Sequence, residues 1–232
     1  FPGKSTTWQL PQLSHASPNL VFAQTAWSVQ TVRKLCDHSM DQHRLPEYII
    51  EVFADPSSVK DVVRGILHTV FFHRFFSSLR PKTRDVLDLT LPFVDDVELE
   101  TLIDQRTAAL IKQLDTKSDT ASRNGGVRGM IFVQFFEKKR RKAWFTKGEE
   151  EVCWEQWTLD VTLATPQTEP ERAKVRQAME QMLLKAAMKI VTVVNREKDH
   201  IPPITTSESN PFPYQIVVNS KESGWGSRMG IL

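Results

Sequence analysis

The sequence predicts an α+β fold in which three helices pack on one face of a largely antiparallel sheet. Two patterns support this prediction. Long segments with apolar residues at helical spacing are interspersed with shorter segments in which apolar and polar residues alternate one by one. Two of the alternating segments also lie close enough in sequence to pair as an antiparallel hairpin. The predicted order along the chain is strand, helix, strand, helix, strand, strand, helix, strand.

The bulk composition excludes several classes of protein. Of the 232 residues, 40% are hydrophobic and 25% are charged, which allows a packed core and excludes wholesale disorder. The net charge of +2 favours no particular partner, and Cys36 and Cys153 are too far apart for a CxxC metal motif. No apolar run reaches transmembrane length, and the first residues lack the order of a signal peptide. We therefore expect a cytoplasmic protein with no integral membrane segment.

Residues 1–46 differ in composition from the rest of the chain. Residues 1–19 carry three prolines and several serines and threonines, a composition with weak structural preference. Residues 21–36 place apolar side chains near one face of a candidate amphipathic helix. We predict a flexible N-terminal extension over residues 1–46 and a folded domain over residues 47–232.

The predicted domain begins with a strand over residues 48–53. Asp55 and Pro56 then supply a helix cap followed by proline at the first helical position. The helix is predicted over residues 56–74, with apolar residues recurring at three- and four-residue spacing. That face comprises Val59, Val62, Val63, Ile66, Leu67, Val70 and Phe71.

A second strand and a second helix follow. Alternating leucines predict a strand over residues 85–91, with its leucines pointing inward and Pro92 ending it. Apolar residues at helical spacing then predict a helix over residues 96–114. Both elements are expected to contribute to the same core.

The next part of the chain is organised around a hairpin with a very long loop. Strands are predicted over residues 128–136 and 152–163, whereas a hairpin ordinarily needs a loop of about two to five residues. The intervening segment is basic over residues 138–142, aromatic at Trp144 and Phe145, and acidic just before the second strand. We interpret the aromatic pair as an exposed docking knob, because aromatic side chains supply large contact area with few rotatable bonds. The alternative is that the pair folds back onto its own sheet.

The last helix has the clearest boundary signals. Thr168 and Glu171 form a capping-box pattern, and the helix is predicted to end near Asn195. Its main apolar stripe comprises Val175, Met179, Met182, Leu183, Ala186, Ile190, Val193 and Val194. A second stripe comprises Leu184, Ala187, Met188 and Val191. Apolar on two sides, this half of the helix should be nearly enveloped, either by the chain itself or by another protein. A final strand is predicted over residues 214–218.

No residue pattern indicates catalysis or a cofactor. The sequence has no GxSxG, HExxH or kinase signature and no glycine-rich phosphate loop. His68 and His73 lie five residues apart, so they do not share a helix face as a metal-binding pair at i, i+4 would. We therefore expect a protein that is not an enzyme and holds no metal and no cofactor.

Two kinds of binding remain open from the residues alone. Basic residues 138–142 could contact phosphates while Trp144 and Phe145 stack on bases. The aromatic pair could instead dock into an apolar pocket on a protein, with the surrounding charges as a rim. Acidic residues 149–151 would repel a polyanion nearby, so a protein partner is favoured over nucleic acid.

Three parts of the sequence carry a resemblance to a known family. They are GILHTVFFHR (65–74), FFEKKRRKAWF with the following CWEQWTLDV (135–161), and IVTVVNREKDHIPP (190–203). Over residues 48–218 the chain resembles the autophagy-related protein 101 family, in the form found in filamentous fungi. The matching segments are spread over several elements in the right order, and residues 1–46 lie outside the resemblance.

The resemblance implies a HORMA domain in a non-enzymatic subunit of the autophagy-initiation kinase complex. It implies that the chain pairs with the HORMA domain of autophagy-related protein 13, stabilises it, and recruits downstream factors to the phagophore assembly site. The exposed WF finger of the family falls on Trp144 and Phe145. The proline that separates the two aromatics in animal members is absent here.

The resemblance also implies where the heterodimer forms, because HORMA partners of this kind pair largely through the long helix and its surroundings. The candidate interface residues are Phe72, His73, Leu184, Ala187, Met188 and Val191. The competing function is a HORMA adaptor in chromatin or DNA repair, with the basic loop as a nuclear or nucleic-acid-binding signal. Such adaptors close a C-terminal segment around a partner peptide, and the short proline-rich tail of this chain argues against that.

Overall fold

The computed structural model describes residues 45–77, 80–120, 127–140, 149–205 and 210–218. The chain divides into two compact units, Phe1–Arg44 and Leu45–Leu232, and every described residue belongs to the second unit. The predicted N-terminal extension lies almost entirely outside the described residues, so its flexibility and its helix stay predictions.

A four-stranded sheet with the strand order β1-β5-β4-β6 forms the centre of the second unit. Its strands are β1 (Glu47–Ala54), β4 (Val127–Arg140), β5 (Glu149–Leu163) and β6 (Tyr214–Val218). β4 pairs antiparallel with both β5 and β6, whereas β1 runs parallel to β5 at the edge of the sheet. The predicted largely antiparallel sheet is therefore confirmed.

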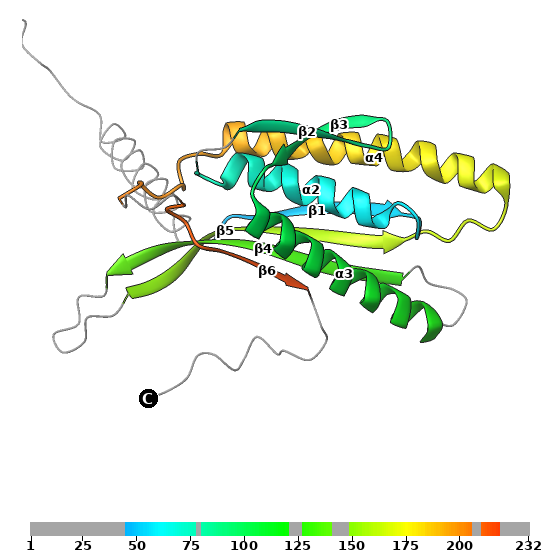
Figure 1. Cartoon of the computed structure of the whole chain (residues 1–232), viewed down its shortest axis with the longest axis horizontal. Helices are drawn as coiled ribbons and strands as arrows, with labels where there is room; N and C mark the ends of the chain where they lie inside the picture. The colour runs from blue at the N-terminus through cyan, green and yellow to red at the C-terminus, as the bar shows by residue number, and fades with distance from the viewer. Residues whose placement is uncertain (1–44, 78–79, 121–126, 141–148, 206–209, 219–232) are drawn as a thin grey trace, which may run out of the picture. The chain divides into compact units, whose positions relative to one another are not determined.

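Three helices pack against this sheet and complete the predicted α+β fold. They are α2 (Val59–Arg74), α3 (Val97–Thr120) and α4 (Glu169–Arg196). α2 contacts both other helices, α3 contacts β4 and β6, and α4 runs along β1 (Figure 1). On β5, the alternation predicted from the sequence buries Trp157, Leu159, Val161 and Leu163.

The capping residues predicted from the sequence form hydrogen bonds at the start of α4 and just before α2. Thr168 and Glu171 exchange the reciprocal hydrogen bonds of a capping box at the start of α4. The Asp55 carboxylate accepts a hydrogen bond from the backbone N–H of Ser58 at 2.8 Å. However, α2 begins at Val59, a few residues later than predicted, because the three residues after Asp55 form a turn.

The single strand predicted over residues 85–91 is wrong. The chain forms two strands there, β2 (Pro81–Val86) and β3 (Leu89–Val94), which pair antiparallel as a separate small sheet. Leu87 lies in the turn between them with a φ of 52°, so the alternation of leucines spans two strands. Pro92 lies inside β3 rather than at its end. By the alternation of an antiparallel ladder, its missing N–H falls at a position that faces away from β2.

The core lies between the sheet and the helices. From α4 it takes the predicted main stripe, in which Met179, Leu183, Ala186, Ile190, Val193 and Val194 are buried. Gly129 of β4 lets α3 approach closely, because a Cβ atom at this position would lie only 2.7 Å from a methyl carbon of Leu110. The helices are therefore held against one face of the sheet along much of their length.

Candidate protein-interaction surfaces

β4 and β5 continue beyond the four-stranded sheet as a two-stranded arm, made of residues 137–140 and 149–152. β1 pairs with β5 only from Gln156 onward, and β6 pairs with β4 only up to Phe135. The strands of the arm pair with each other, and Figure 1 shows them extending past β1 and β6. The arm leads to residues 141–148, which connect its two strands.

Opposite charges face each other across the arm. In the strand register, Lys138 lies opposite Glu151, Lys139 opposite Glu150, and Arg140 opposite Glu149. Lys139 also forms an ion pair with Glu137 on its own strand. Cross-strand pairs of opposite charge stabilise a sheet by roughly 0.2–1 kcal/mol each. Much of the charged segment that was predicted to be loop forms this ladder. β4 and β5 are therefore longer than predicted.

Trp144 and Phe145 lie outside the described residues, between the two strands of the arm. The WF finger, and the alternative in which the pair folds back, both stay predictions. The described part of the chain bears on the nucleic-acid alternative, because two of the five residues of the basic run, Lys138 and Lys139, lie opposite glutamates. Their charges are balanced within the arm, which weakens them as phosphate contacts.

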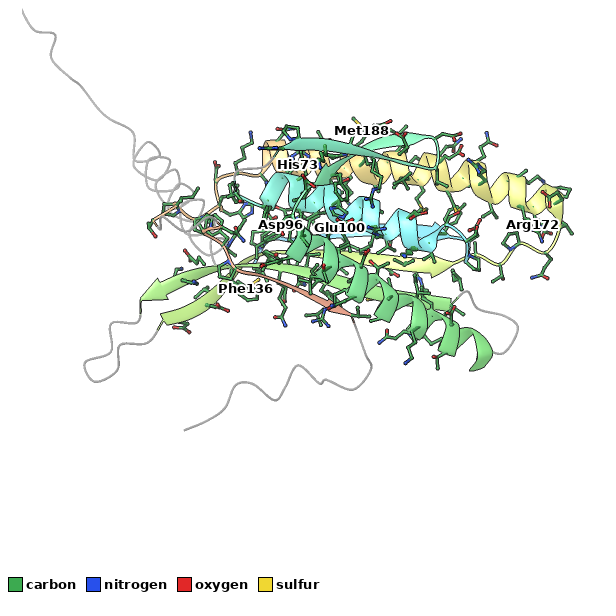
Figure 2. The ribbon with its side chains drawn as sticks, viewed as in Figure 1. His73, Asp96, Glu100, Phe136, Arg172 and Met188 are labelled. Atoms are coloured by element: carbon green, nitrogen blue, oxygen red, sulfur yellow. The ribbon has the colours of Figure 1, made fainter. Side chains whose placement is uncertain are left out.

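The second apolar stripe of α4 is partly exposed. Leu184 is 48% exposed and Met188 is 56% exposed, whereas Ala187 and Val191 are partly buried. At about 100° per residue, Leu184 and Met188 lie on the side of the helix opposite the buried Ala186. Figure 2 shows Met188 on the outer side of α4. The alternative in which the chain itself envelops this half of the helix is wrong for the described residues, because α4 packs against them through one face. The alternative in which another protein covers the second stripe stays a prediction.

The two other candidate interface residues, Phe72 and His73, lie at the C-terminal end of α2. His73 is labelled in Figure 2. Phe72 and His73 are half-buried, and their rings meet edge to face with centroids 5.4 Å apart. Burial lowers the pKa of His73, and the positive charge of Arg74 lowers it further. His73 is therefore a neutral aromatic side chain at physiological pH. Because α2 packs against α4, both sets of candidate residues belong to one helical layer.

A buried ionic cluster of Glu155, Arg74 and His200 fixes the chain that follows α4. The Glu155 carboxylate accepts a hydrogen bond from Arg74 Nε at 2.8 Å and is hydrogen-bonded to His200 Nε2 at 2.7 Å. Arg74 also donates to the backbone carbonyl of Glu197, just after α4. Burial by itself would raise the pKa of Glu155, but the hydrogen bonds from His200 and Arg74 outweigh burial and lower it. The carboxylate therefore stays charged and joins β5, α2 and the segment after α4.

This cluster was not predicted from the sequence. Glu155 occupies an inward position of β5, two residues before Trp157, and a charged residue there needs a buried partner. An acidic residue at an inward strand position was therefore the sequence signal that pointed to a buried partner. The partners themselves were not predictable, because Arg74 lies 81 residues earlier and His200 lies in the segment between the last predicted helix and the last predicted strand.

The described residues contain no group of three or more potential metal ligands. His68 is buried with its ring centroid 4.1 Å from that of Phe93, and burial, reinforced by nearby arginine charges, lowers its pKa to about 3. Its neutral ring therefore belongs to the core beneath β3. Separately, no helix of the described chain combines the length and the hydrophobicity needed to cross a membrane.

Comparison with known protein families adds independent evidence. The sequence model of the family described as Autophagy-related protein 101 matches residues 51–208, a range that includes the arm, the buried ionic cluster and all of α4. The chain belongs to the autophagy-related protein 101 family. The resemblance identified from the three sequence segments is confirmed.

Relatives in the autophagy-related protein 101 family come from fungi, plants and animals. The chain is 33% identical to the Schizosaccharomyces pombe protein over 168 residues, which cover 72% of this chain and 83% of that protein. It is 29% identical to the Arabidopsis thaliana protein over 208 residues, covering 80% and 91% of the two chains. The Homo sapiens protein is 26% identical over 167 residues, covering 68% and 75%. Membership of the autophagy-related protein 101 family gives this chain a role in autophagy.

Proposed function

We propose that the chain is a non-enzymatic adaptor subunit of the autophagy-initiation kinase complex. Residues 47–232 form a HORMA domain that pairs with the HORMA domain of autophagy-related protein 13 and stabilises it. The complex acts in the cytoplasm and, when autophagy is induced, at the phagophore assembly site. Family membership supports the role in autophagy, and the exposed stripe of α4 supports the pairing.

The exposed stripe is the single observation that carries the pairing. Fully burying a leucine or methionine side chain stabilises a protein by about 1.5–3 kcal/mol. Leu184 and Met188 leave roughly half of their surface in water, so a partner has apolar area to bury. The exposed Lys185 and Lys189 border them, which matches the apolar centre and polar rim of a protein interface. The proposed interface comprises Phe72, His73, Leu184, Ala187, Met188 and Val191.

Substitution at the stripe tests the pairing. The double variant Leu184→Asp, Met188→Asp should abolish binding to the HORMA domain of autophagy-related protein 13 in size-exclusion chromatography and calorimetry. Its circular dichroism spectrum and melting temperature should stay close to those of the unchanged chain, because both side chains are exposed. Val97→Asp is the matched control, since Val97 is also an exposed apolar residue on a helix. Binding that survives the double variant would contradict the proposed interface.

We propose further that Trp144 and Phe145 form a WF finger that recruits downstream factors of autophagy. The arm supports this proposal, because a self-paired ribbon with balanced charges can carry the connecting residues beyond the sheet. Replacing both aromatic residues by alanine should leave folding and heterodimer formation unchanged while autophagosome formation falls. A large drop in melting temperature in this variant would mean that the pair belongs to the core instead.

The chromatin adaptor is the competing proposal, and it depends on the basic run as a nuclear or nucleic-acid-binding signal. Lys138 and Lys139 lie opposite glutamates across the arm, which favours a structural role for their charges. A pull-down of the full chain from starved cells separates the two functions. The autophagy proposal predicts subunits of the autophagy-initiation kinase complex, and recovery of chromatin proteins without them would overturn it.

A further inference from the structure

The outer edge of β1 carries backbone groups that do not pair with β5. The backbone oxygen of Pro46 accepts a hydrogen bond from Gln156 of β5, and that of Ala54 accepts one from Ala164, directly after β5. The even-numbered residues of β1 therefore turn their N–H and C=O groups toward that strand. The backbone groups of the odd-numbered residues within 47–53 therefore point away from the sheet. An edge of this kind is a template on which another strand can pair.

α4 covers the two halves of this edge differently. In the C-terminal half of β1, the outward N–H of Phe53 lies 3.1 Å from the sulfur of Met182, a short contact that brings the helix close to the strand. In the N-terminal half, the carbonyl of Ile49 accepts a hydrogen bond from Lys189 Nζ at 2.6 Å. A lysine side chain is long and flexible. Lys189 can therefore span a wider gap between α4 and β1 in this half, and its side chain can be displaced from the Ile49 carbonyl.

An open hollow of about 430 Å³ lies between α4 and this half of β1. Its lining includes the apolar Met182 and Ala186, the basic Lys185 and Lys189, and one acidic residue, Glu51. The two lysines stand four residues apart on α4, so their like charges repel each other. Lys189 is hydrogen-bonded to a neutral carbonyl rather than to a carboxylate. With two lysines against one glutamate, the lining carries a net positive charge and favours an anionic occupant.

The side of β1 that faces away from the core is partly apolar. Ile49 is 53% exposed, and the exposed Glu47 and Glu51 flank it along the strand. An added strand would place alternate side chains on the two sides of the sheet. One set would lie beside Ile49, and the other set would face Lys185 and Lys189 of α4.

We propose that residues 47–51 are a docking edge for an extended segment of a partner protein, in which acidic and apolar side chains alternate. The segment pairs with the outward backbone groups of β1 as an additional strand. Its acidic side chains meet Lys185 and Lys189, and its apolar side chains cover Ile49. An N–H group of the segment takes the place of Lys189 Nζ on the Ile49 carbonyl, which frees the ammonium group to bind a carboxylate.

This docking edge adjoins the proposed heterodimer surface and shares with it only the rim residues Lys185 and Lys189. At about 100° per residue, Lys185 and Lys189 lie roughly a quarter of a turn around α4 from Leu184 and Met188. The double variant Leu184→Ala, Met188→Ala removes apolar area without adding charge beside the lysines, so it should weaken the heterodimer and leave strand docking intact. It serves as a control that separates failure of this inference from failure of the heterodimer proposal.

Phage display tests the predicted chemistry of the partner segment. A library of random eight-residue peptides is selected on the full chain and counter-selected on the variant Ile49→Pro, which lacks one outward N–H group but keeps the ladder to β5. Enriched peptides should alternate acidic residues with β-branched or aromatic residues. No enrichment over the variant, or enrichment of basic peptides, would overturn the proposal.

Binding of one selected peptide, measured by fluorescence anisotropy, then tests the named residues. Ile49→Pro should weaken the affinity about tenfold, the effect of losing one backbone hydrogen bond. Lys185→Glu combined with Lys189→Glu should weaken it at least as much. Equal affinity for the chain and either variant would contradict the docking edge.

Hydrogen exchange of the unchanged chain gives a result that does not depend on any variant folding. The outward amide of Ile49 should exchange quickly in the free chain and slowly with the peptide bound. The amides of Ile50 and Val52 already pair with β5 and should be protected in both states. Peptide binding without added protection at Ile49 would place the peptide elsewhere and overturn the proposal.

Discussion

At the scale of single residues, Glu155 determines how three separate parts of the chain meet. Its carboxylate is fully buried and binds Arg74 of α2 and His200 of the segment after α4. A buried ion pair adds little stability compared with apolar residues of the same size, but losing one partner leaves the other charge buried and uncompensated. The cluster therefore makes the position of the chain after α4 depend on one side chain.

Glu155→Gln should lower the free energy of unfolding by about 3 kcal/mol, because the 3%-exposed Arg74 would keep its charge without a carboxylate. Urea unfolding followed by circular dichroism measures the change. Glu180→Gln is the matched control, since Glu180 pairs with Arg176 at the surface and its loss should change stability by less than about 1 kcal/mol. Equal losses in the two variants would show that the buried cluster has no special role.

His68 should make the protein sensitive to mild acid. Burial lowers its pKa from 6.5 to about 3, so the folded state resists a proton that the unfolded state binds. Above pH 6.5 the ring is neutral in both states, and the free energy of unfolding does not depend on its titration. As the pH falls from 6.5 toward 3, the free energy of unfolding decreases, because the unfolded state binds a proton that the folded state does not. At pH 5 the loss is about 2 kcal/mol, at roughly 1.4 kcal/mol per pH unit.

The variant His68→Phe keeps an aromatic ring against Phe93 but cannot titrate. Urea unfolding of both proteins at pH 7.5 and pH 5.0 should therefore give a smaller loss of stability for the variant. The difference between the two losses isolates His68 from the other titrating groups. Identical losses would mean that the ring is protonated freely in the folded state.

At the scale of elements, the long helix and the central strands were the most predictable parts of the fold. The capping box at Thr168 and the main apolar stripe of α4 appear in the structure as predicted, because both depend on local spacing alone. The inward positions of β5 follow from alternation in the same way. The exposure of Leu184 and Met188 was not predictable, because an apolar stripe does not reveal whether its own chain covers it.

The small sheet shows why the single-strand prediction for residues 85–91 failed. Leu87, Leu89 and Leu91 alternate as they would along one strand, but Leu87 adopts a left-handed turn that β-alternation cannot reveal. Pro92 was interpreted as a strand end, although a proline is tolerated where its backbone nitrogen faces away from the partner strand. The pairing of β2 with β3, rather than local sequence preference, determines the backbone conformation at Leu87 and Pro92.

The charge ladder of the arm can be tested by exchanging its charges. Lys138→Glu with Lys139→Glu should weaken the arm by roughly 0.2–1 kcal/mol per pair, because like charges then face each other. The amides of the arm should exchange faster, while global unfolding stays nearly unchanged. Adding Glu150→Lys and Glu151→Lys restores opposite charges and should restore the slow exchange. Continued fast exchange in the fourfold variant would contradict a structural role for the ladder.

At the scale of the whole molecule, a fold with an internally fixed core presents separate surfaces to other proteins. The stripe of α4 and the outer edge of β1 lie on different sides of one helix, and the arm extends beyond the sheet. The sequence was sufficient to predict the α+β class and the family, since both depend on features spread along the chain. It was not sufficient to predict which surfaces remain uncovered, because coverage depends on the packing of distant elements.

Methionine oxidation tests whether the outer side of α4 is the pairing surface. Met188 is 56% exposed and Met179 is 2% exposed, so dilute peroxide should oxidise Met188 rapidly and Met179 slowly in the free chain. With a saturating amount of the HORMA domain of autophagy-related protein 13, peptide mass spectrometry should show Met188 oxidation slowed severalfold and Met179 unchanged. An unchanged oxidation rate of Met188 in the formed complex would contradict the account.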